Sequence, residues 1–191
     1  MTDSRTRETA SKRERLVASA RELMHQQGVE RTTLSEVAHA ADVPPGNVYY
    51  YFKTKDELVE QMIDAQLQEI EAMLASLKRR PTPQARLKAL IRALTDQSDL
   101  AAQYGCPHGS LCQELDKRDD DLRQTASKLM ARPLDWAEQQ FRLMGRRDAR
   151  DLAVALVASY QGISLVTNTF RDPELMAREG RRLERWIDSL A

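Results

Sequence analysis

The sequence predicts an all-α protein with an N-terminal three-helix domain and a larger C-terminal helical domain. Leu, Ala, Arg, Glu, Gln and Met, which favour helices, dominate the chain, and runs of β-branched residues are nearly absent. Hydrophobic residues make up 41% of the 191 residues, so the chain can bury a sizeable core. Capping residues and apolar stripes at helical spacing recur along the chain, and they place each helix in turn.

Two helices are expected at the N-terminal end. The first runs from near Ser11 to Gly28, where glycine ends the apolar stripe. The second begins at Thr33, because Glu36 three residues later completes a capping box. Asp42 is expected at the corner that follows, in a left-handed conformation that a short polar side chain tolerates.

A third helix is expected to begin at Pro44–Pro45, since proline suits the first helical position. Val48, Tyr51 and Phe52 lie at positions i, i+3 and i+4, so these side chains are expected to turn inward. The residues left facing or flanking the outside are Gly46, Asn47, Tyr49 and Tyr50. Two adjacent exposed tyrosines in a chain with 5% aromatic residues indicate a binding surface rather than ordinary surface aromatics.

A fourth, long helix is expected to begin at Thr54 and to continue to about Lys78, with Glu57 completing a second capping box. A fifth helix carries an apolar stripe from Leu87 to Leu94. The segment Tyr104–Gly109 concentrates glycine and proline, which predicts an irregular structure. A short helix from Ser110 to about Lys117 is expected to follow.

Three helices are expected to close the chain. Asp119, Asp120 and Asp121 favour a helix N-terminus, and the helix from about Asp120 to Met144 contains Pro133, which predicts a kink. The next helix, which carries Leu152 to Phe170, is apolar around much of its girth, which predicts contact with a partner chain. The last carries Leu183, Trp186, Ile187 and Leu190, and self-association is expected through these last two helices.

Charge and hydropathy restrict the class of protein. The 29 Lys and Arg residues balance 29 Asp and Glu residues, so net charge gives no argument for nucleic acid. Basic residues do crowd the N-terminal stretch, where they contact phosphates or simply form a solvated terminus; they are Arg5, Arg7, Lys12, Arg13, Arg15 and Arg21. No apolar run approaches the roughly 20 residues that span a bilayer, which predicts a soluble, cytoplasmic protein with no membrane partner.

The string from Thr32 to Lys55, TTLSEVAHAADVPPGNVYYYFKTK, is typical of a helix-turn-helix. Together with the Asp56–Leu58 continuation, it resembles the TetR family of bacterial transcriptional repressors. The resemblance is specific over the first third of the chain and agrees only in length and helical character beyond it. It implies an N-terminal arm and DNA-binding domain over residues 1–54, with the helix-turn-helix at about 33–52. Residues 55–191 then form a helical regulatory, ligand-binding and dimerisation domain.

The resemblance implies a set of DNA contacts. Thr33 and Lys55 hold phosphates at two helix N-termini, Gly46 lets the backbone approach DNA, and Tyr49 contacts a phosphate, while Asn47 and Tyr50 lie nearest the base edges. Two positions depart from the family pattern: Pro45 replaces a frequent lysine and removes a cationic contact, and Asp42 replaces a frequent glycine. The expected DNA-binding residues are Thr33, Pro45, Gly46, Asn47, Tyr49, Tyr50, Lys53 and Lys55.

The resemblance therefore implies a repressor that binds a palindromic operator as a homodimer, with half-sites about 34–36 Å apart. A small-molecule inducer or modification of a cysteine releases the dimer from DNA. An enzyme is not expected, because His25, His39 and His108 lie apart and near no nucleophile or phosphate-loop motif. The alternative is a helical protein-interaction module that has lost DNA binding, which Pro45 and the zero net charge favour. No cofactor or metal is expected.

An inducer cavity is expected between the helices of the second domain, with core packing as the alternative for each candidate. The candidates are Met62, Met73, Leu94, Cys106, His108, Leu111, Met130, Trp136, Phe141 and Tyr160. Cys106 and Cys112 allow three interpretations. They are inert thiols in a structured turn, or Cys106 senses oxidants or electrophiles with Cys112 as its resolving thiol, or both bind a soft metal together with His108.

Overall fold

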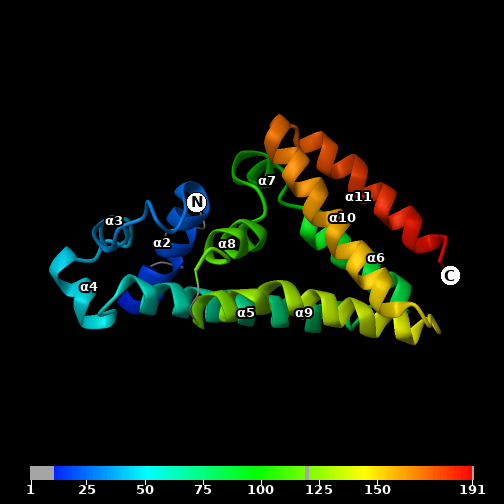
Figure 1. Cartoon of the computed structure of the whole chain (residues 1–191), viewed down its shortest axis with the longest axis horizontal. Coiled ribbons are helices and arrows are strands. Elements are labelled where there is room, and N and C mark those ends of the chain that lie inside the picture. Colours follow the sequence, from blue (N-terminus) through cyan, green and yellow to red (C-terminus); the bar gives the residue numbers. More distant parts are fainter. Residues whose placement is uncertain (1–10, 119–120, 191) are drawn as a thin grey trace. The chain divides into compact units, whose positions relative to one another are not determined.

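The computed structural model describes residues 11–118 and 121–190, and it contains no β-strand within these ranges (Figure 1). The predicted all-α class is confirmed. The chain forms two compact units. One comprises Met1–Leu67 together with Leu111–Ala126, and the other comprises Gln68–Ser110 and Ser127–Ala191. The first unit thus extends beyond the expected boundary at residue 54 and includes a later segment of the chain.

The first unit begins with the three helices that the sequence predicts: α2 (Lys12–Gln27), α3 (Leu34–Ala40) and α4 (Pro45–Tyr51). Ser11 caps α2, and Gly28 ends it with a φ of 89°. At α3 the hydroxyl of Thr33 accepts from the Glu36 N–H and the Glu36 carboxylate accepts from the Thr33 N–H, which confirms the capping box. Arg5 and Arg7 of the expected basic arm lie outside the described residues.

The core of the first unit joins these helices to the next one. Its most deeply buried apolar side chains are Leu16, Ala20, Val37, Ala38, Val48, Phe52, Leu58, Val59, Met62 and Ile63. Arg13 lies over the ring of Phe52, with its guanidinium carbon 5.1 Å from the ring centroid, so α2 also covers the end of α4. Tyr51 is only half-buried, so its expected core position was wrong, and its ring lies edge-on against that of the exposed Tyr50.

The fourth predicted helix is α5 (Lys55–Leu77). The Thr54 hydroxyl caps it by accepting from the Glu57 N–H at 3.1 Å. The Glu57 carboxylate, however, accepts from the N–H of Lys53 at 2.7 Å, one residue before the position that a capping box requires. The predicted box at Thr54 is therefore only half formed, although the helix begins where it was expected.

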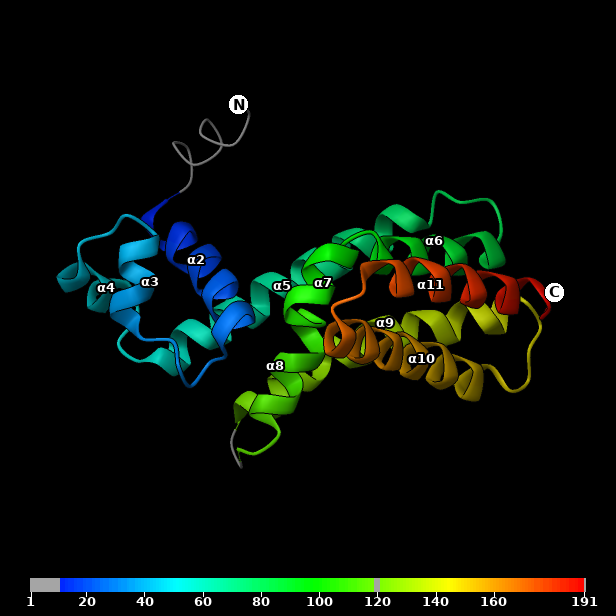
Figure 2. The ribbon, with the colours of Figure 1, turned by 90° about the horizontal axis from the view of Figure 1, so that it is seen from above.

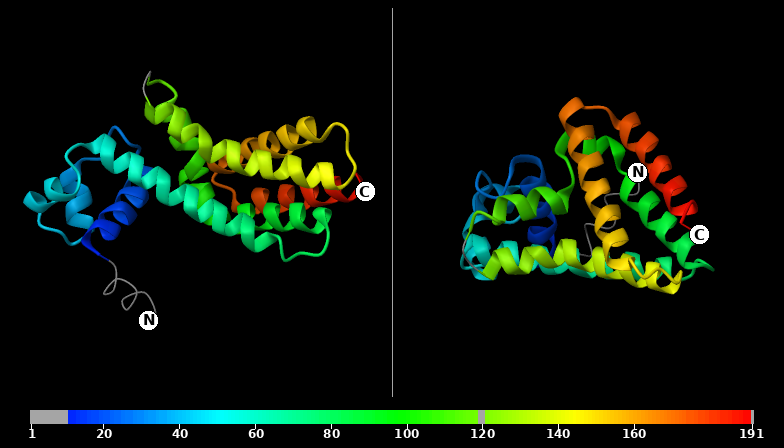
Figure 3. Two further views of the ribbon diagram at one scale, coloured as in Figure 1. Left: turned by 90° about the horizontal axis from the view of Figure 1, so that it is seen from below. Right: turned by 45° about the vertical axis from the view of Figure 1, so that its right-hand side comes forward.

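The second unit contains α6 (Pro83–Thr95), α7 (Ser98–Tyr104), α10 (Ala149–Phe170) and α11 (Pro173–Asp188). α6 packs along α11, and α10 packs against α7 and α11 (Figures 2 and 3). Arg171, in a left-handed conformation, and Asp172 form the tight turn between α10 and α11. The sequence reasoning missed α7 altogether.

Two helices, α8 (Pro107–Leu115) and α9 (Asp121–Leu143), contribute residues to both units. α8 begins at Pro107 rather than at Ser110, because proline occupies its first position, so the irregular segment is limited to Gly105 and Cys106. α9 runs as one helix through Pro133, and the kink expected at this proline stays a prediction. Asp121 starts α9 as predicted, whereas Asp119 and Asp120 lie outside the described residues.

α10 has an unusual surface for a helix of a single chain. Its inner side packs in the second unit, yet Val154, Leu165, Val166 and Phe170 are exposed. Phe170, at the last position of the helix, is 69% exposed. α10 is long and apolar enough to cross a membrane by length and composition, a test that core helices of soluble proteins also pass, so the expectation that no apolar run approaches this length does not hold for α10.

Candidate nucleic-acid interface and effector pocket

α4 presents the predicted recognition residues to solvent. Val48 is buried completely and anchors the helix from within, as does Phe52 at its end. On the other side Tyr49 is 56% and Tyr50 80% exposed, and Asn47 is also exposed. The predicted outward residues of this helix therefore face outward.

Gly46 lies in the first turn of α4 and has open space around it. A Cβ at this position would meet no heavy atom within 4 Å. The fold itself therefore does not require glycine at this position. The absence of a side chain would instead allow a neighbouring molecule to approach the backbone closely.

The hydrogen-bonding side chains on the exposed side of α4 carry no charge. α4 contains no Lys or Arg, so the polar groups that it can offer to bases are the Asn47 amide and the tyrosine hydroxyls. The ring of Tyr50 is held edge-on against that of Tyr51, with centroids 5.2 Å apart. An Asn side chain can pair with adenine through two hydrogen bonds, and a tyrosine ring can contact a thymine methyl group.

The corner between α3 and α4 is fixed by the backbone. Asp42 has a φ of 52°, which confirms its predicted left-handed conformation. The Val43 N–H donates to the Ala38 carbonyl at 2.9 Å, and the Asp42 N–H donates to the His39 carbonyl at 3.1 Å. The Asp42 side chain lies at the surface, 3.9 Å from the Arg15 guanidinium. Asp42 thus replaces glycine without disturbing the turn.

Thr33 lies at the exposed N-terminus of α3, but its hydroxyl is engaged. It donates to the Glu36 carboxylate at 2.8 Å and accepts from the Glu36 N–H at 3.2 Å. The backbone N–H of Thr33, which donates to the same carboxylate, lowers the pKa of Glu36 below its ordinary value, and the hydroxyl adds to this effect. A phosphate at this helix end would therefore lie close to a carboxylate.

Lys55 was expected to hold a phosphate, and the structure directs it elsewhere. Its ammonium donates to the carbonyl oxygens of Val29, Glu30 and Thr32 at 3.1, 3.2 and 3.2 Å, respectively. An ammonium group has three N–H donors, so all are used within the protein. The nearby Lys53 is exposed and donates to the Tyr49 carbonyl at 2.9 Å. Lys53 is therefore the better placed of the two for a phosphate.

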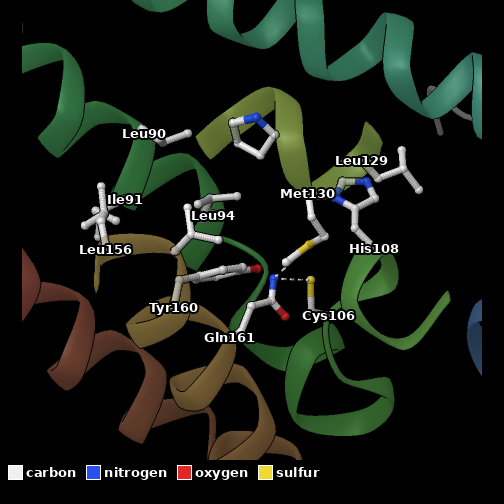
Figure 4. Close-up of a pocket in the computed structure, with 12 residues that line it drawn as sticks. Leu90, Ile91, Leu94, Cys106, His108, Leu129, Met130, Leu156, Tyr160 and Gln161 are labelled. Carbon is white, nitrogen blue, oxygen red and sulfur yellow. Dashed lines mark hydrogen bonds between the residues drawn. The ribbon is translucent and has the colours of Figure 1, made fainter. Parts of the chain in front are cut away.

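The second unit contains a pocket between α6, α8, α9 and α10, shown in Figure 4. Its volume is about 420 Å³, including the part that is open to solvent. The lining is mainly apolar and comprises Leu90, Ile91, Leu94, Cys106, His108, Leu129, Met130, Pro133, Leu156, Val157, Tyr160 and Gln161.

Five of the ten expected ligand-binding residues line this pocket, namely Leu94, Cys106, His108, Met130 and Tyr160. The other five, which are Met62, Met73, Leu111, Trp136 and Phe141, do not. Met62 and Leu111 are buried in the first unit. Trp136 and Phe141 are buried elsewhere in the second unit, where Phe141 packs edge-on against Trp186. The sequence reasoning also missed Gln161, which only the packing of α10 on α8 brings to the pocket.

The thiol of Cys106 is the centre of the pocket's polar groups. Cys106 directly precedes α8, and its Sγ accepts from the Gly109 N–H at 3.4 Å. The Gln161 amide donates to the same sulfur at 3.6 Å and lies 3.6 Å from Met130 Sδ (Figure 4). Burial raises the pKa of the Tyr160 hydroxyl, and its hydrogen bond to Cys106 adds to this rise. Tyr160 therefore stays a neutral donor at physiological pH.

Cys112 has different surroundings from Cys106. It is half-buried, and its thiol donates to the Ala126 carbonyl at 3.2 Å in the first unit. Cys106 and Cys112 are not joined in a disulfide. Among residues 11–118 and 121–190, no group of three His, Cys, Asp or Glu side chains is placed to hold a metal ion.

Comparisons with known proteins agree with this geometry. Residues 16–62 match the family described as "Bacterial regulatory proteins, tetR family", and residues 83–183 match "Tetracyclin repressor-like, C-terminal domain". The HTH-type transcriptional regulator TtgR of Pseudomonas putida is 27% identical over 97% of this chain and 92% of its own length. An uncharacterised HTH-type regulator of Lactococcus lactis is 27% identical over 84% of this chain and 85% of its own.

Solved structures show the same fold. The crystal structure of a TetR transcriptional regulator from Legionella pneumophila superposes with a TM-score of 0.83 and 16% identity, covering 94% of this chain and 97% of its own. At this identity the likeness concerns the fold alone.

Proposed function

Because the chain belongs to the TetR family of transcriptional regulators, we propose that it represses transcription by binding a palindromic operator as a homodimer. The observation that carries the proposal is the solvent-facing side of α4, with Asn47, Tyr49 and Tyr50 exposed around a buried Val48. A surface of this kind serves no purpose in the unit's own core. It matches a helix that enters the major groove of DNA.

The proposed contacts follow the exposed groups. Asn47 and Tyr50 read base edges, Gly46 allows close approach, and Tyr49 and Lys53 contact phosphates. Thr33 offers the N-terminus of α3, Pro45 begins the recognition helix without a cation, and Lys55 supports the loop before α3 instead of binding DNA. With few cations in the interface, affinity should depend on salt less steeply than in a regulator with a lysine-rich recognition helix.

The proposed homodimer forms through α10. Val154, Leu165, Val166 and Phe170 leave an apolar surface exposed on this helix of the single chain. Burying such a surface against the same surface of a second copy would give an interface with two-fold symmetry. That symmetry matches a palindromic operator.

The proposed effector site is the pocket of the second unit. Its small volume and apolar lining suit a small, uncharged molecule. Release from DNA requires only that the molecule bind better to the form of the dimer that does not fit the operator. Modification of the Cys106 thiol, which lies in the same pocket, would have the same effect by adding volume there. The regulator would act in the cytoplasm, where its operator lies.

Selection of bound sequences from a random double-stranded DNA library tests the proposal. The wild-type chain should enrich a palindrome, and Asn47→Ala should relax the sequence preference within each half-site. Gln139→Ala, which removes an exposed amide on α9, is the control and should leave the enriched sequence unchanged. Failure to enrich any sequence would favour the alternative, a helical interaction module without DNA binding, which the lack of a cation on α4 supports.

A further inference from the structure

Two sulfur atoms in the pocket of the second unit face one nitrogen atom. The side-chain amide nitrogen of Gln161 lies 3.6 Å from Sγ of Cys106 and 3.6 Å from Sδ of Met130 (Figure 4). The two sulfur atoms come from different elements, since Cys106 directly precedes α8 and Met130 lies within α9. Their lone pairs therefore converge on one point, where the Gln161 amide donates to both.

The amide of Gln161 is a poor partner for this pair of sulfur atoms. Thiol and thioether sulfur are weak hydrogen-bond acceptors, so little is lost when the two contacts are broken. Gln161 is only half-buried, and its flexible side chain can turn toward the open part of the pocket. A soft metal ion suits the same point better, because thiolate and thioether ligands select monovalent copper over hard cations.

A third ligand lies two residues from Cys106. His108 lines the same pocket from the first turn of α8, and imidazole nitrogen also suits copper. The pocket thus offers one thiol, one thioether and one imidazole. Zn²⁺ is bound by about four ligands of the Cys, His or carboxylate type. Cys106 and His108 are two of these, and no third such side chain joins them in the part of the chain that the structure describes.

The charge of the pocket also favours a monovalent ion. The lining is mainly apolar and contains no Asp or Glu, so an uncompensated charge there would be costly. When the Cys106 thiol binds a monovalent ion, the S–H proton leaves to solvent and an S–metal bond forms, so the charges of thiolate and cation cancel. No electron is transferred in this exchange. A divalent ion on the same ligands would leave one positive charge uncompensated.

The surroundings of Cys106 support a bound thiolate. The Gly109 N–H donates to its Sγ at 3.4 Å, and the Tyr160 hydroxyl forms a hydrogen bond to the same residue. Donors of this kind orient a ligating atom and tune its charge. Neither donor depends on Gln161, so both remain when the Gln161 amide turns away.

We infer that Cys106, Met130 and His108 form a binding site for a monovalent soft metal ion such as Cu⁺. Cys106 Sγ and Met130 Sδ are its two principal ligands, and His108 is the third. Met130 takes the place that the sequence suggested for Cys112, whose thiol donates to the Ala126 carbonyl in the first unit. The site lies in the proposed effector pocket, yet binding of the ion is a property of the chain itself and needs no DNA.

Competition with the Cu⁺ chelator bathocuproine disulfonate, without oxygen, measures the affinity of the full chain. Every protein compared carries Cys112→Ser, which removes the thiol outside the pocket. This parent protein should bind one Cu⁺ per chain. Adding Met130→Leu, which nearly keeps the side-chain volume, should weaken binding by at least about tenfold, since even indirect partners of a metal contribute about 10–100-fold.

Met73→Leu is the matched control for the thioether. Met73 is a half-buried methionine of the second unit that does not line the pocket, so this variant should bind Cu⁺ as the parent does. Cys106→Ser should abolish competition with the chelator, and His108→Ala should weaken it. Zn²⁺ should not displace Cu⁺ from the parent protein.

Methyl NMR of methionine-labelled parent protein identifies the ligand without any change in the pocket. Titration with Ag⁺, which has the same charge and preference for sulfur, should shift the Met130 methyl resonance and leave that of Met73 in place. Equal Cu⁺ affinity of the parent and Met130→Leu, an unmoved Met130 resonance, or displacement of Cu⁺ by Zn²⁺ would overturn the inference. If a variant fails to fold, the Met130 resonance decides. A DNA selection that enriches no operator would refute the proposed function and leave this result untouched.

Discussion

Gly180 on α11 lies against Thr95 on α6, so close that a Cβ on Gly180 would be 3.1 Å from Cγ2 of Thr95. Gly180→Ala should lower the free energy of unfolding by about 1 kcal/mol, because overpacking costs about 1–3 kcal/mol and the gain in helix propensity is about 1 kcal/mol. Urea denaturation checks this. Adding Thr95→Ser, which removes Cγ2 and keeps the hydroxyl that donates to Ile91, should restore stability; if it does not, the contact is not the cause.

The opposite result is expected at Gly46, where a Cβ meets nothing. Gly46→Ala should raise the free energy of unfolding by about 0.5–1 kcal/mol, since alanine is the better helix former. It should nevertheless weaken operator binding, because the methyl group blocks the approach of the DNA backbone. Denaturation and a mobility shift on the selected operator measure the two effects. A variant that is more stable and binds DNA equally well would remove Gly46 from the interface.

Features that depend only on residues close in the sequence were predicted well. The Thr33–Glu36 capping box and the left-handed Asp42 depend on neighbours within a few residues, and both were predicted correctly. The identity of the α4 side chains that face solvent follows from helical periodicity around the buried Val48. These local features define the DNA-binding unit, so the sequence predicts that part of the site well.

Features that depend on distant packing were predicted poorly. Lys55 shows the phosphate-binding pattern, yet the loop that ends α2 brings three carbonyl groups within its reach. Gln161 has no local signal, and its place beside Cys106 depends on the close approach of α8 at Gly109. Met62 was expected in the pocket, but it is buried in the other unit. An apolar residue alone does not reveal whether it faces a cavity or a core.

Lys55→Ala should lower stability and thereby weaken binding to every DNA sequence alike. Loss of its ammonium leaves three carbonyl groups of a partly buried loop without their donor, which should cost about 1–2 kcal/mol of unfolding free energy. Lys53→Ala is the matched control, since Lys53 is exposed and should change stability by less than about 0.5 kcal/mol. Unchanged stability with weaker DNA binding would instead restore Lys55 as a phosphate contact.

Stability should depend on Tyr160 at alkaline pH. Burial raises the pKa of its hydroxyl in the folded protein, whereas in the unfolded chain it ionises near its usual value of about 10. Below that value both states keep the proton and the contribution to stability is complete. As the pH rises above about 10 the unfolded state loses its proton first, so stability falls by up to about 1.4 kcal/mol per pH unit. Urea midpoints from pH 8 to 10.5 should fall less for Tyr160→Phe than for the wild type, and parallel curves would contradict this assignment.

The proposed dimer makes a prediction for α10. Leu165 is 62% exposed on the single chain, so Leu165→Glu should leave the fold of each chain intact. If α10 pairs with its copy, the substitution brings carboxylates into an apolar interface, which is costly without a partner charge. The variant should then sediment as a monomer and lose cooperative operator binding.

Leu143→Glu provides the control, because Leu143 is 58% exposed at the end of α9. It introduces the same charge on the same residue type outside the exposed side chains of α10. Sedimentation velocity at matched concentrations should show a dimer for this variant and for the wild type. If Leu165→Glu also remains a dimer, the interface lies elsewhere, and the exposed side chains of α10 have another purpose. The half-site spacing of the operator would then have to arise from a different pair of helices.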